Sequence, residues 1–247
     1  MRRTLTPDQF ALAWSRTDGD RIPYPLAVRL SAADNVQRAA QLPALHRWCD
    51  EHLDADLEAA LRVLARPALR AEVFGYALGA PIRVLGAVAG EIAVVAAQLP
   101  GSAPDRGGDI RISVGSARTF AARVITPLPR NSAGTLAALT APLARVTEDS
   151  RDLVTVPVSG PSVPARIRRL LRAPRDGIGQ IVVSVRRDAG ALAPFGVLCW
   201  IDITGDGRYA VRTGAEVEIT PVTAESFAGR LRPMLTAAGR VTPRALW

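Results

Sequence analysis

Two segments of the chain, residues 112–128 and 219–235, resemble each other without a gap. Each begins in a β-rich stretch, passes a serine or threonine suited to cap a helix, and continues into a helical stretch with phenylalanine and arginine at matching positions. This shared order favours a duplication, although chance agreement in a chain rich in alanine and arginine is the alternative. The sequence therefore predicts a single domain, residues 1–247, made of two related halves, residues 1–130 and 131–247.

Hydrophobic periodicity repeats the same order of elements, helices, then a sheet, then a helix, in both halves. Thr6, followed by Pro7, predicts the start of the first helix, and Thr223 predicts the start of the last helix. Prolines after Ile22 and Tyr24 predict an extended segment at 22–26, and residues 127–160 are irregular to helical. The expected helices cover residues 6–17, 32–41, 44–53, 56–66, 116–126, 161–175 and 223–238, and the expected strands 69–76, 81–88, 92–98, 109–114, 179–186, 196–203, 207–212 and 216–220.

The halves differ in the length of one connection. The interval from Val84 to Phe120 is six residues longer than the matching interval from Val197 to Phe227. The extra residues fall in the Gly/Pro-rich stretch 100–108, between two expected strands. Because long exposed loops on a rigid scaffold often carry binding function, this loop is a candidate binding site.

The basic charge at first suggests a nucleic-acid partner. The formal net charge is +8, but the 31 basic residues, all arginine, are scattered among 23 acidic residues. The one dense run, at 166–175, shares its helix with apolar residues at 163, 167, 170 and 171, so the arginines form the polar side of an amphipathic helix. No aromatic residues lie among them for base stacking. A solvated or partner-facing surface is therefore favoured, and a nucleic-acid patch is the alternative.

No set of residues suggests catalysis. His46, Cys49 and Asp50 share a helix face, but no fourth metal ligand accompanies them. Residues 202–207 imitate the start of a calcium loop, yet Thr213 stands where that loop needs a glutamate, so a hairpin turn at 205–207 is favoured. Nucleotide-binding and nucleophile motifs are missing. We expect no enzymatic activity, cofactor or metal ion.

Other signals concern location. The start of the chain has no apolar run of signal-peptide length, and the longest apolar stretch, 84–99, is too short for a membrane span. The two cysteines, Cys49 and Cys199, lie far apart and favour small core residues over a disulfide framework. We expect a cytoplasmic protein without membrane insertion.

Several stretches, in order along nearly the whole chain, resemble the EspG family of ESX (type VII) secretion-associated proteins. They are LTPDQFALAW (5–14), IPYPL (22–26), LCWID (198–202) followed by GRY (207–209), and VEITP (217–221) before the last helix. The resemblance implies an α+β fold in which a central antiparallel β-sheet is flanked by N-terminal and C-terminal helical subdomains around a pseudo-two-fold axis.

The resemblance also implies a function. It implies a cytosolic chaperone that binds the hydrophobic tip of the PPE subunit in a PE/PPE heterodimer and keeps the pair soluble for export. The chaperone is expected to bind no nucleic acid and to be a monomer or homodimer when no partner is bound. A nucleic-acid-associated or regulatory α/β binding protein without catalysis is the alternative. In the family, a loop between two strands of the first half and the C-terminal helical region contact the partner. By position, the expected contact residues are Leu99, Pro100, Ser102, Pro104, Asp105, Arg106 and Asp109 in the loop, and Arg168, Arg169 and Arg172 in the helix.

Overall fold

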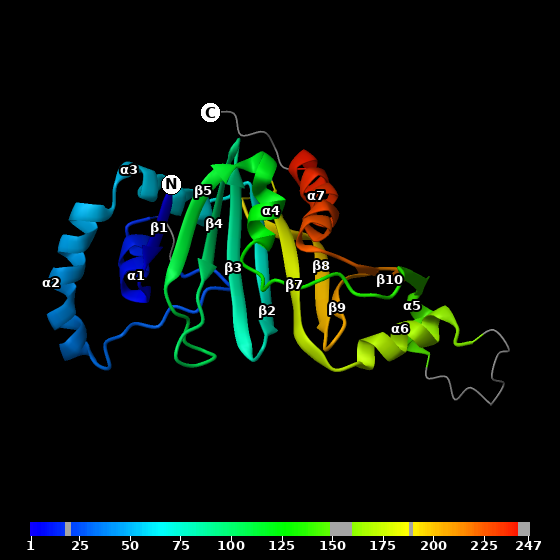
Figure 1. Ribbon diagram of the computed structural model, residues 1–247. Helices are drawn as coiled ribbons and strands as arrows, with labels where there is room; N and C mark the ends of the chain where they lie inside the picture. Colours follow the sequence, from blue (N-terminus) through cyan, green and yellow to red (C-terminus); the bar gives the residue numbers. More distant parts are fainter. Residues whose placement is uncertain (18–20, 149–159, 188–189, 242–247) are drawn as a thin grey trace.

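A large antiparallel β-sheet forms the centre of the protein (Figure 1). The computed structural model describes residues 1–17, 21–148, 160–187 and 190–241. Within these ranges the sheet has ten strands in the order β1-β5-β4-β3-β2-β7-β8-β9-β10-β6. The strands are β1 (Arg2–Leu5), β2 (Leu69–Ala77), β3 (Ala80–Ala89), β4 (Ile92–Gln98), β5 (Ile110–Ser116), β6 (Leu139–Pro142), β7 (Arg175–Arg186), β8 (Leu192–Ile203), β9 (Gly207–Thr213) and β10 (Glu216–Pro221).

Helices cover the two faces of the sheet unequally. On one face, α4 and α7 pack over the centre, against β2, β3, β7 and β8. On the opposite face, α1 and α3 pack over β3 and β4, with α2 packed on α1, while α5 and α6 pack near the far edge against β6 and β10. The helices are α1 (Pro7–Ser15), α2 (Asn35–His52), α3 (Ala55–Ala65), α4 (Phe120–Ile125), α5 (Leu143–Thr147), α6 (Val163–Arg172) and α7 (Ala224–Val241), with a 3-10 turn at Ala117–Thr119 before α4.

Side-chain caps explain where the N-terminal helices begin. Thr6 and Gln9 form a reciprocal capping box at α1, in which the Thr6 hydroxyl accepts the Gln9 N–H and the Gln9 side chain accepts the Thr6 N–H. The carboxylates of Asp34 and Asp54 accept backbone N–H groups at the starts of α2 and α3. Leucines at helical spacing then bury one face of α3.

Three expectations from the sequence were wrong in detail. The helices expected at 32–41 and 44–53 are one helix, α2, with Pro43 inside it. Pro43 lacks the N–H that would bond to the carbonyl of Ala39, but Ala39 is exposed and water can satisfy that group. Residues 22–26 contain a turn with a cis Tyr24–Pro25 bond, where Leu26 N–H donates to the Pro23 carbonyl at 3.1 Å. The edge strands β1 and β6 were missed, because four residues are too short for a recognisable alternation.

Other expectations were confirmed. The apolar stretch 84–99 lies largely within the buried strands β3 and β4. The calcium-like stretch is the turn between β8 and β9, with Gly205 at a φ of 73°. Cys49 is buried, and Cys199 is partly buried in β8.

The two halves of the chain meet at the centre of the sheet, where β2 pairs with β7 along its whole length. Each half contains four consecutive strands followed by a helix, β2 to β5 with α4, and β7 to β10 with α7. The connection between β4 and β5 spans residues 99–109, whereas residues 214 and 215 join β9 to β10. The extra length is therefore in the expected loop. A common origin of the two segments, and the division into residues 1–130 and 131–247, stay predictions.

Candidate partner-binding surface

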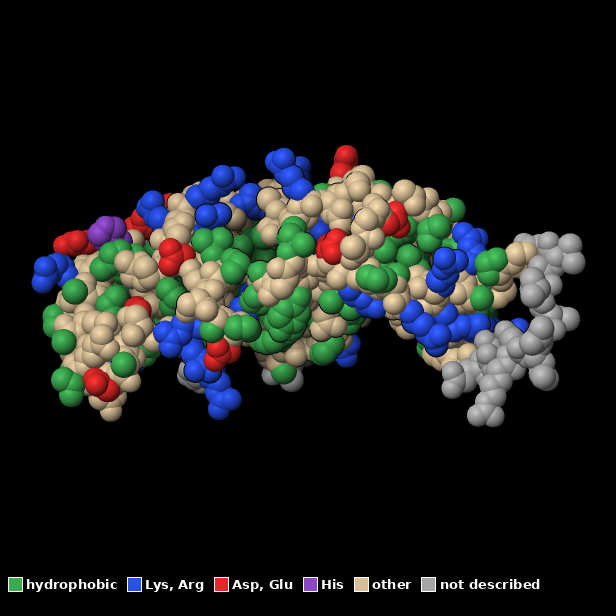
Figure 2. Space-filling view, turned by 60° about the horizontal axis from the view of Figure 1, so that its bottom comes forward, with side chains coloured by type: hydrophobic (Ala, Val, Ile, Leu, Met, Phe, Trp, Pro, Cys, Tyr) green, Lys and Arg blue, Asp and Glu red, His purple; other side chains and the backbone are tan. Residues whose placement is uncertain are grey.

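One face of the sheet is left uncovered between its two groups of helices. In β2, the residues at odd positions are buried under α4 and α7, while those at even positions point to the opposite face and are half-buried or exposed. The same alternation continues into β7, where Ile181 is buried and Ile178 is 42% exposed. Figure 2 shows the molecule as an arch, hollowed between its two ends, with hydrophobic side chains gathered near the middle.

Most side chains on this uncovered face are apolar, although the exposed Gln180 lies between Ile178 and Val182 on β7 and opposite Phe74. The apolar ones are called the central patch below. Tyr76 lies opposite Ile178 across the β2–β7 pair, and Val182 lies opposite Val197 across β7–β8. The Phe74 ring lies 5.6 Å from Tyr24 and 5.5 Å from Tyr76, measured between ring centroids. The exposed fractions are 52% for Tyr24, 44% for Tyr76 and 43% for Val197. The central patch comprises Tyr24, Phe74, Tyr76, Ile178, Val182 and Val197.

Contiguous exposed apolar side chains of this kind mark interaction sites in folded proteins. Tyrosines are well suited to such a site, since each offers a large rigid apolar ring and a polar hydroxyl. The strands below the patch are held by a tightly packed pair of glycines. Trp200 lies over Gly75 and Gly179, and a Cβ atom added at Gly179 would meet the indole at 2.1 Å. The patch therefore sits on a rigid support.

The loop at residues 99–109 borders one side of the central patch. The side-chain amide of Gln98 accepts the Ala27 N–H at 2.8 Å and donates to the carbonyls of Ala27 and Gly108. Arg83, which is buried and is the partner of Phe74 across β2–β3, donates to the Pro104 carbonyl. Arg29 forms a 2.6 Å ion pair with Asp105 at the surface. These contacts hold the loop in a defined position before any partner binds.

Most of the expected loop residues are exposed to solvent. Pro100, Ser102, Pro104, Asp105 and Arg106 are exposed. Leu99 and Asp109 are only partly exposed, and the Leu99 N–H donates to the Asp109 carbonyl at 2.9 Å where β4 and β5 separate. The tip of the loop, and not its base, is therefore available for contact.

The expected arginines lie on the opposite side of the central patch. Ile167 and Leu170 bury the apolar side of α6, which leaves Arg169 and Arg172 exposed. Arg168 is different, because its guanidinium donates to the Arg145 carbonyl at 2.8 Å and so helps to join α6 to α5. After α6 the chain enters β7 and reaches Ile178 of the central patch.

The structure thus does not bring the two expected groups together. The loop follows β4 in the first half, and α6 packs near the far edge of the sheet (Figure 1). They lie on either side of the central patch, which the sequence reasoning missed. A signal for it was present in β2, where Phe74 and Tyr76 are apolar although their neighbours Val73 and Ala77 already supply the buried face.

One carboxylate lies beside the central patch. Burial raises the pKa of Glu72, and the nearby Arg70 guanidinium opposes this shift from 3.6 Å. Burial also raises the pKa of Tyr24, and the negative charge of Glu72 adds to that rise. Both shifts reflect a surface already partly screened from water in the free protein.

The possible metal ligands His46, Cys49 and Asp50 in α2 make contacts within the protein instead. Arg16 binds the Asp50 carboxylate at 3.0 Å and contacts the His46 ring at 3.3 Å, while Cys49 is buried. Across the described ranges, no group of three or more His, Cys, Asp or Glu side chains could hold a metal ion. No helix in those ranges is long and apolar enough to cross a membrane.

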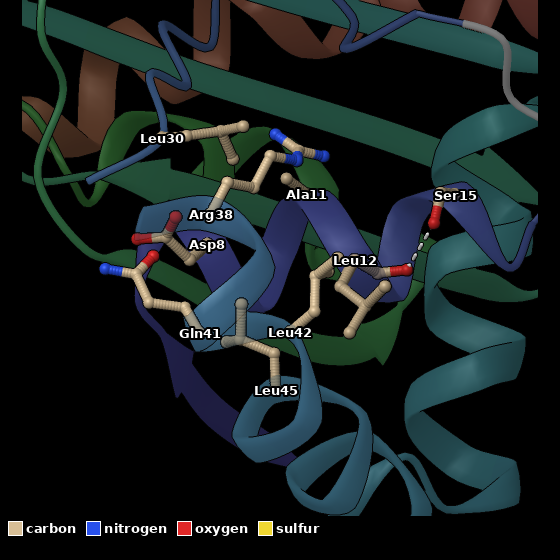
Figure 3. Close-up of a pocket in the computed structure, with 9 residues that line it drawn as sticks. All are labelled: Asp8, Ala11, Leu12, Ser15, Leu30, Arg38, Gln41, Leu42 and Leu45. Atoms are coloured by element: carbon tan, nitrogen blue, oxygen red, sulfur yellow. Dashed lines mark hydrogen bonds between the residues drawn. The ribbon is translucent and has the colours of Figure 1, made fainter. Parts of the chain in front are cut away.

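A small hollow lies between α1 and α2 (Figure 3). Its volume is about 80 Å³, and leucines 12, 30, 42 and 45 line it together with Asp8 and Arg38 near each other at one end. Pockets for drug-sized ligands have volumes of roughly 300–1,000 Å³. The hollow is therefore a gap in helix packing, too small to be the main functional site.

Comparison with known proteins identifies a protein family and a solved structure of similar fold. A family model described as EspG family matches residues 6–233. A solved structure of the Mycobacterium tuberculosis type VII secretion system chaperone EspG5, in complex with a PE25-PPE41 dimer, is similar in fold with a TM-score of 0.67. The alignment covers 100% of this chain and 99% of that chain, at 19% sequence identity. No curated protein matches the sequence.

Proposed function

Because this chain belongs to the EspG family, we propose that it is a cytoplasmic chaperone that binds a PE/PPE heterodimer through the PPE subunit and keeps it soluble for type VII (ESX) secretion. Binding of this kind needs a preformed apolar surface and no catalytic group. The observation that carries the proposal is the central patch, an uncovered stretch of apolar side chains between the two groups of helices.

The central patch fits the apolar tip of a partner for two physical reasons. First, all of its side chains except that of Tyr24 project from β-strands, so little backbone entropy is lost on binding. Second, its borders are polar: the loop at 99–109 carries Asp105 and Arg106, and α6 carries Arg169 and Arg172. An apolar centre with a polar rim is the usual anatomy of a specific protein interface. The expected residues of the loop and of α6 thus become proposed rim contacts.

Co-expression with a PE/PPE pair tests the proposal. The expected result is a 1:1:1 complex on gel filtration, and Ile178→Asp should weaken it by at least about tenfold, because a charge is then buried against the apolar tip. Ile92→Asp is the matched control, since Ile92 is 50% exposed but lies at the start of β4, outside the patch.

Two results would contradict the proposal. One is failure to form a complex with every PE/PPE pair of the same genome. The other is a complex that Ile178→Asp and Ile92→Asp weaken equally, with both variants folded by circular dichroism. Retention on DNA or RNA that falls steeply with salt would instead support the nucleic-acid alternative.

A further inference from the structure

We propose that the partner carries a carboxylate-rich segment beside its apolar tip and that the exposed arginines of α6 receive it. The inference rests on the proposed function, since it names the chemistry of the partner at one border of the central patch. The α6 border below means Arg169 and Arg172, with Arg175 at the start of β7.

The first reason is a local surplus of positive charge. Arg169 and Arg172 are exposed and form no ion pair within the described part of the chain. Of the acidic residues near them along the chain, Glu148 pairs with Arg145 at 3.3 Å, and the Asp176 carboxylate accepts the Thr204 hydroxyl at 2.7 Å. Within the described ranges, the charges of Arg169 and Arg172 are therefore not compensated by an ion pair.

The usual explanation for arginine near a helix end accounts for only part of this pattern. Cations in the last turn of a helix interact favourably with its dipole, and Arg169 and Arg172 lie in that turn of α6. Arg175 also serves the end of α6, because its guanidinium donates to the Leu171 carbonyl, and Arg145 in the last turn of α5 pairs with Glu148. The dipole supplies no anionic partner, so Arg169 and Arg172 stay exposed without an ion pair among the described residues. These guanidinium groups also make the surface well suited to carboxylates, which guanidinium can bind with two parallel hydrogen bonds.

The second reason is continuity with the central patch. Arg175 begins β7, and Ile178 follows on the same strand. In addition, the N–H of Leu78, in the turn after β2, donates to the carbonyl of Asp176 at 2.8 Å, which ties this border to the patch. Figure 2 shows Lys/Arg side chains gathered along the right-hand arm, next to the hollow. A partner seated on the patch would therefore lie within reach of these arginines.

The third reason is the contrast with the opposite border. At that border, the negative charge of Asp105 in the loop at 99–109 is balanced by Arg29, which pairs with it at 2.6 Å. A partner with acidic residues on one side of its tip would be attracted in one orientation and not in the reversed one. Charge complementarity at an interface rim mainly sets orientation and association rate, so the α6 border gives the register of binding.

The test uses charge reversal in the complex. Arg169→Glu/Arg172→Glu should lower the association rate of the PE/PPE pair by about tenfold at low salt, with the difference shrinking at high salt. The control is Arg232→Glu/Arg240→Glu, which makes the same change in net charge at exposed arginines of α7, on the opposite face of the sheet. Equal rates for the two double variants would overturn the inference while leaving the proposed function intact.

A second measurement is independent of the PE/PPE pair. A fluorescent oligoglutamate peptide should bind the isolated chain and the α7 control at low salt, and should bind Arg169→Glu/Arg172→Glu more weakly by at least about threefold. Equal weakening by both double variants would contradict the inference, because it would reflect net charge alone. The inference would also be contradicted if an oligonucleotide bound the chain through Arg169 and Arg172 while the oligoglutamate peptide did not bind. If no PE/PPE pair binds, the proposed function fails and the peptide result still decides the chemistry of the border.

Discussion

A buried ion pair between β8 and β9 should be among the most sensitive points of the fold. Arg208 donates from Nε to Asp202 Oδ1 at 2.7 Å and from Nη2 to Asp202 Oδ2 at 2.8 Å, and the two residues are direct partners across the strands. Their side chains are only 2% and 6% exposed. The same guanidinium donates to the Pro129 carbonyl at 3.0 Å, so the pair also fixes the segment after α4.

Arg208→Met removes one partner and leaves the Asp202 carboxylate buried without its counter-charge. Breaking a buried pair in this way costs about 3–5 kcal/mol of unfolding free energy. For a chain of this size, each kcal/mol shifts the melting temperature by roughly 2–4 °C. We therefore expect a fall in melting temperature of about 10 °C. Arg212→Met, an exposed arginine on the same strand, should change the unfolding free energy by no more than about 0.5 kcal/mol.

Urea denaturation separates the charge effect from lost packing. The double variant Asp202→Leu/Arg208→Met contains no buried charge, so it should be more stable than Arg208→Met alone, with an unchanged dependence on urea concentration. The reasoning would be refuted if Arg208→Met cost less than about 1 kcal/mol, or if the double variant lost as much as the two single variants together.

Three other substitutions test the supports of the central patch. Gln98→Ala leaves the Ala27 N–H and the Gly108 carbonyl without their side-chain partner, while the Ala27 carbonyl keeps the Gly107 N–H. The change should cost about 1–3 kcal/mol and speed hydrogen exchange at Gly107 and Gly108, while most strand amides of β3 stay protected. Gly179→Ala forces a Cβ atom against Trp200 and should destabilise by about 1–3 kcal/mol in a thermal melt, whereas Gly214→Ala, with open space around it, should not. Glu72→Gln should raise the free energy of unfolding at neutral pH, because burial raises the pKa of Glu72 and the ionised carboxylate therefore disfavours folding once the pH exceeds that raised pKa. The gain should vanish below about pH 4, where Glu72 is protonated in both the folded and the unfolded chain. A gain for Glu72→Gln that is independent of pH would contradict the assignment.

Local signals in the sequence predicted much of the fold. The cap at Thr6, with Pro7 and Gln9 behind it, marks the start of α1 because all three act within one helical turn. The strand block from β2 to β5 follows from runs of β-branched and small apolar residues, and β4 was predicted at its observed bounds. The amphipathic pattern of α6 was also correct, with Ile167 and Leu170 buried.

Features that depend on distant parts of the chain were not predictable in this way. Strand β1 exists because Arg2 to Leu5 pair with β5, and β6 because it pairs with β10. Neither partner is visible from the four residues themselves.

The central patch was missed for a related reason. The outward side of β2 looks like a second buried face in sequence, and only the placement of α1, α3, α5 and α6 leaves Phe74 and Tyr76 uncovered. By contrast, the loop at 99–109 was found, because its length could be counted against the second half. Its role in binding, and that of Arg168, Arg169 and Arg172, stays a prediction.

Site-specific photo-crosslinking tests the central claim most directly. A photoreactive residue is placed at Tyr76, in the middle of the central patch, and in a parallel protein at Ile92, which is similarly exposed but lies outside the patch. The chain is then irradiated in the presence of a PE/PPE heterodimer. We predict crosslinks from position 76 to the PPE subunit and none from position 92. Crosslinks from position 92 alone, or equal crosslinking from both positions, would contradict binding through the central patch.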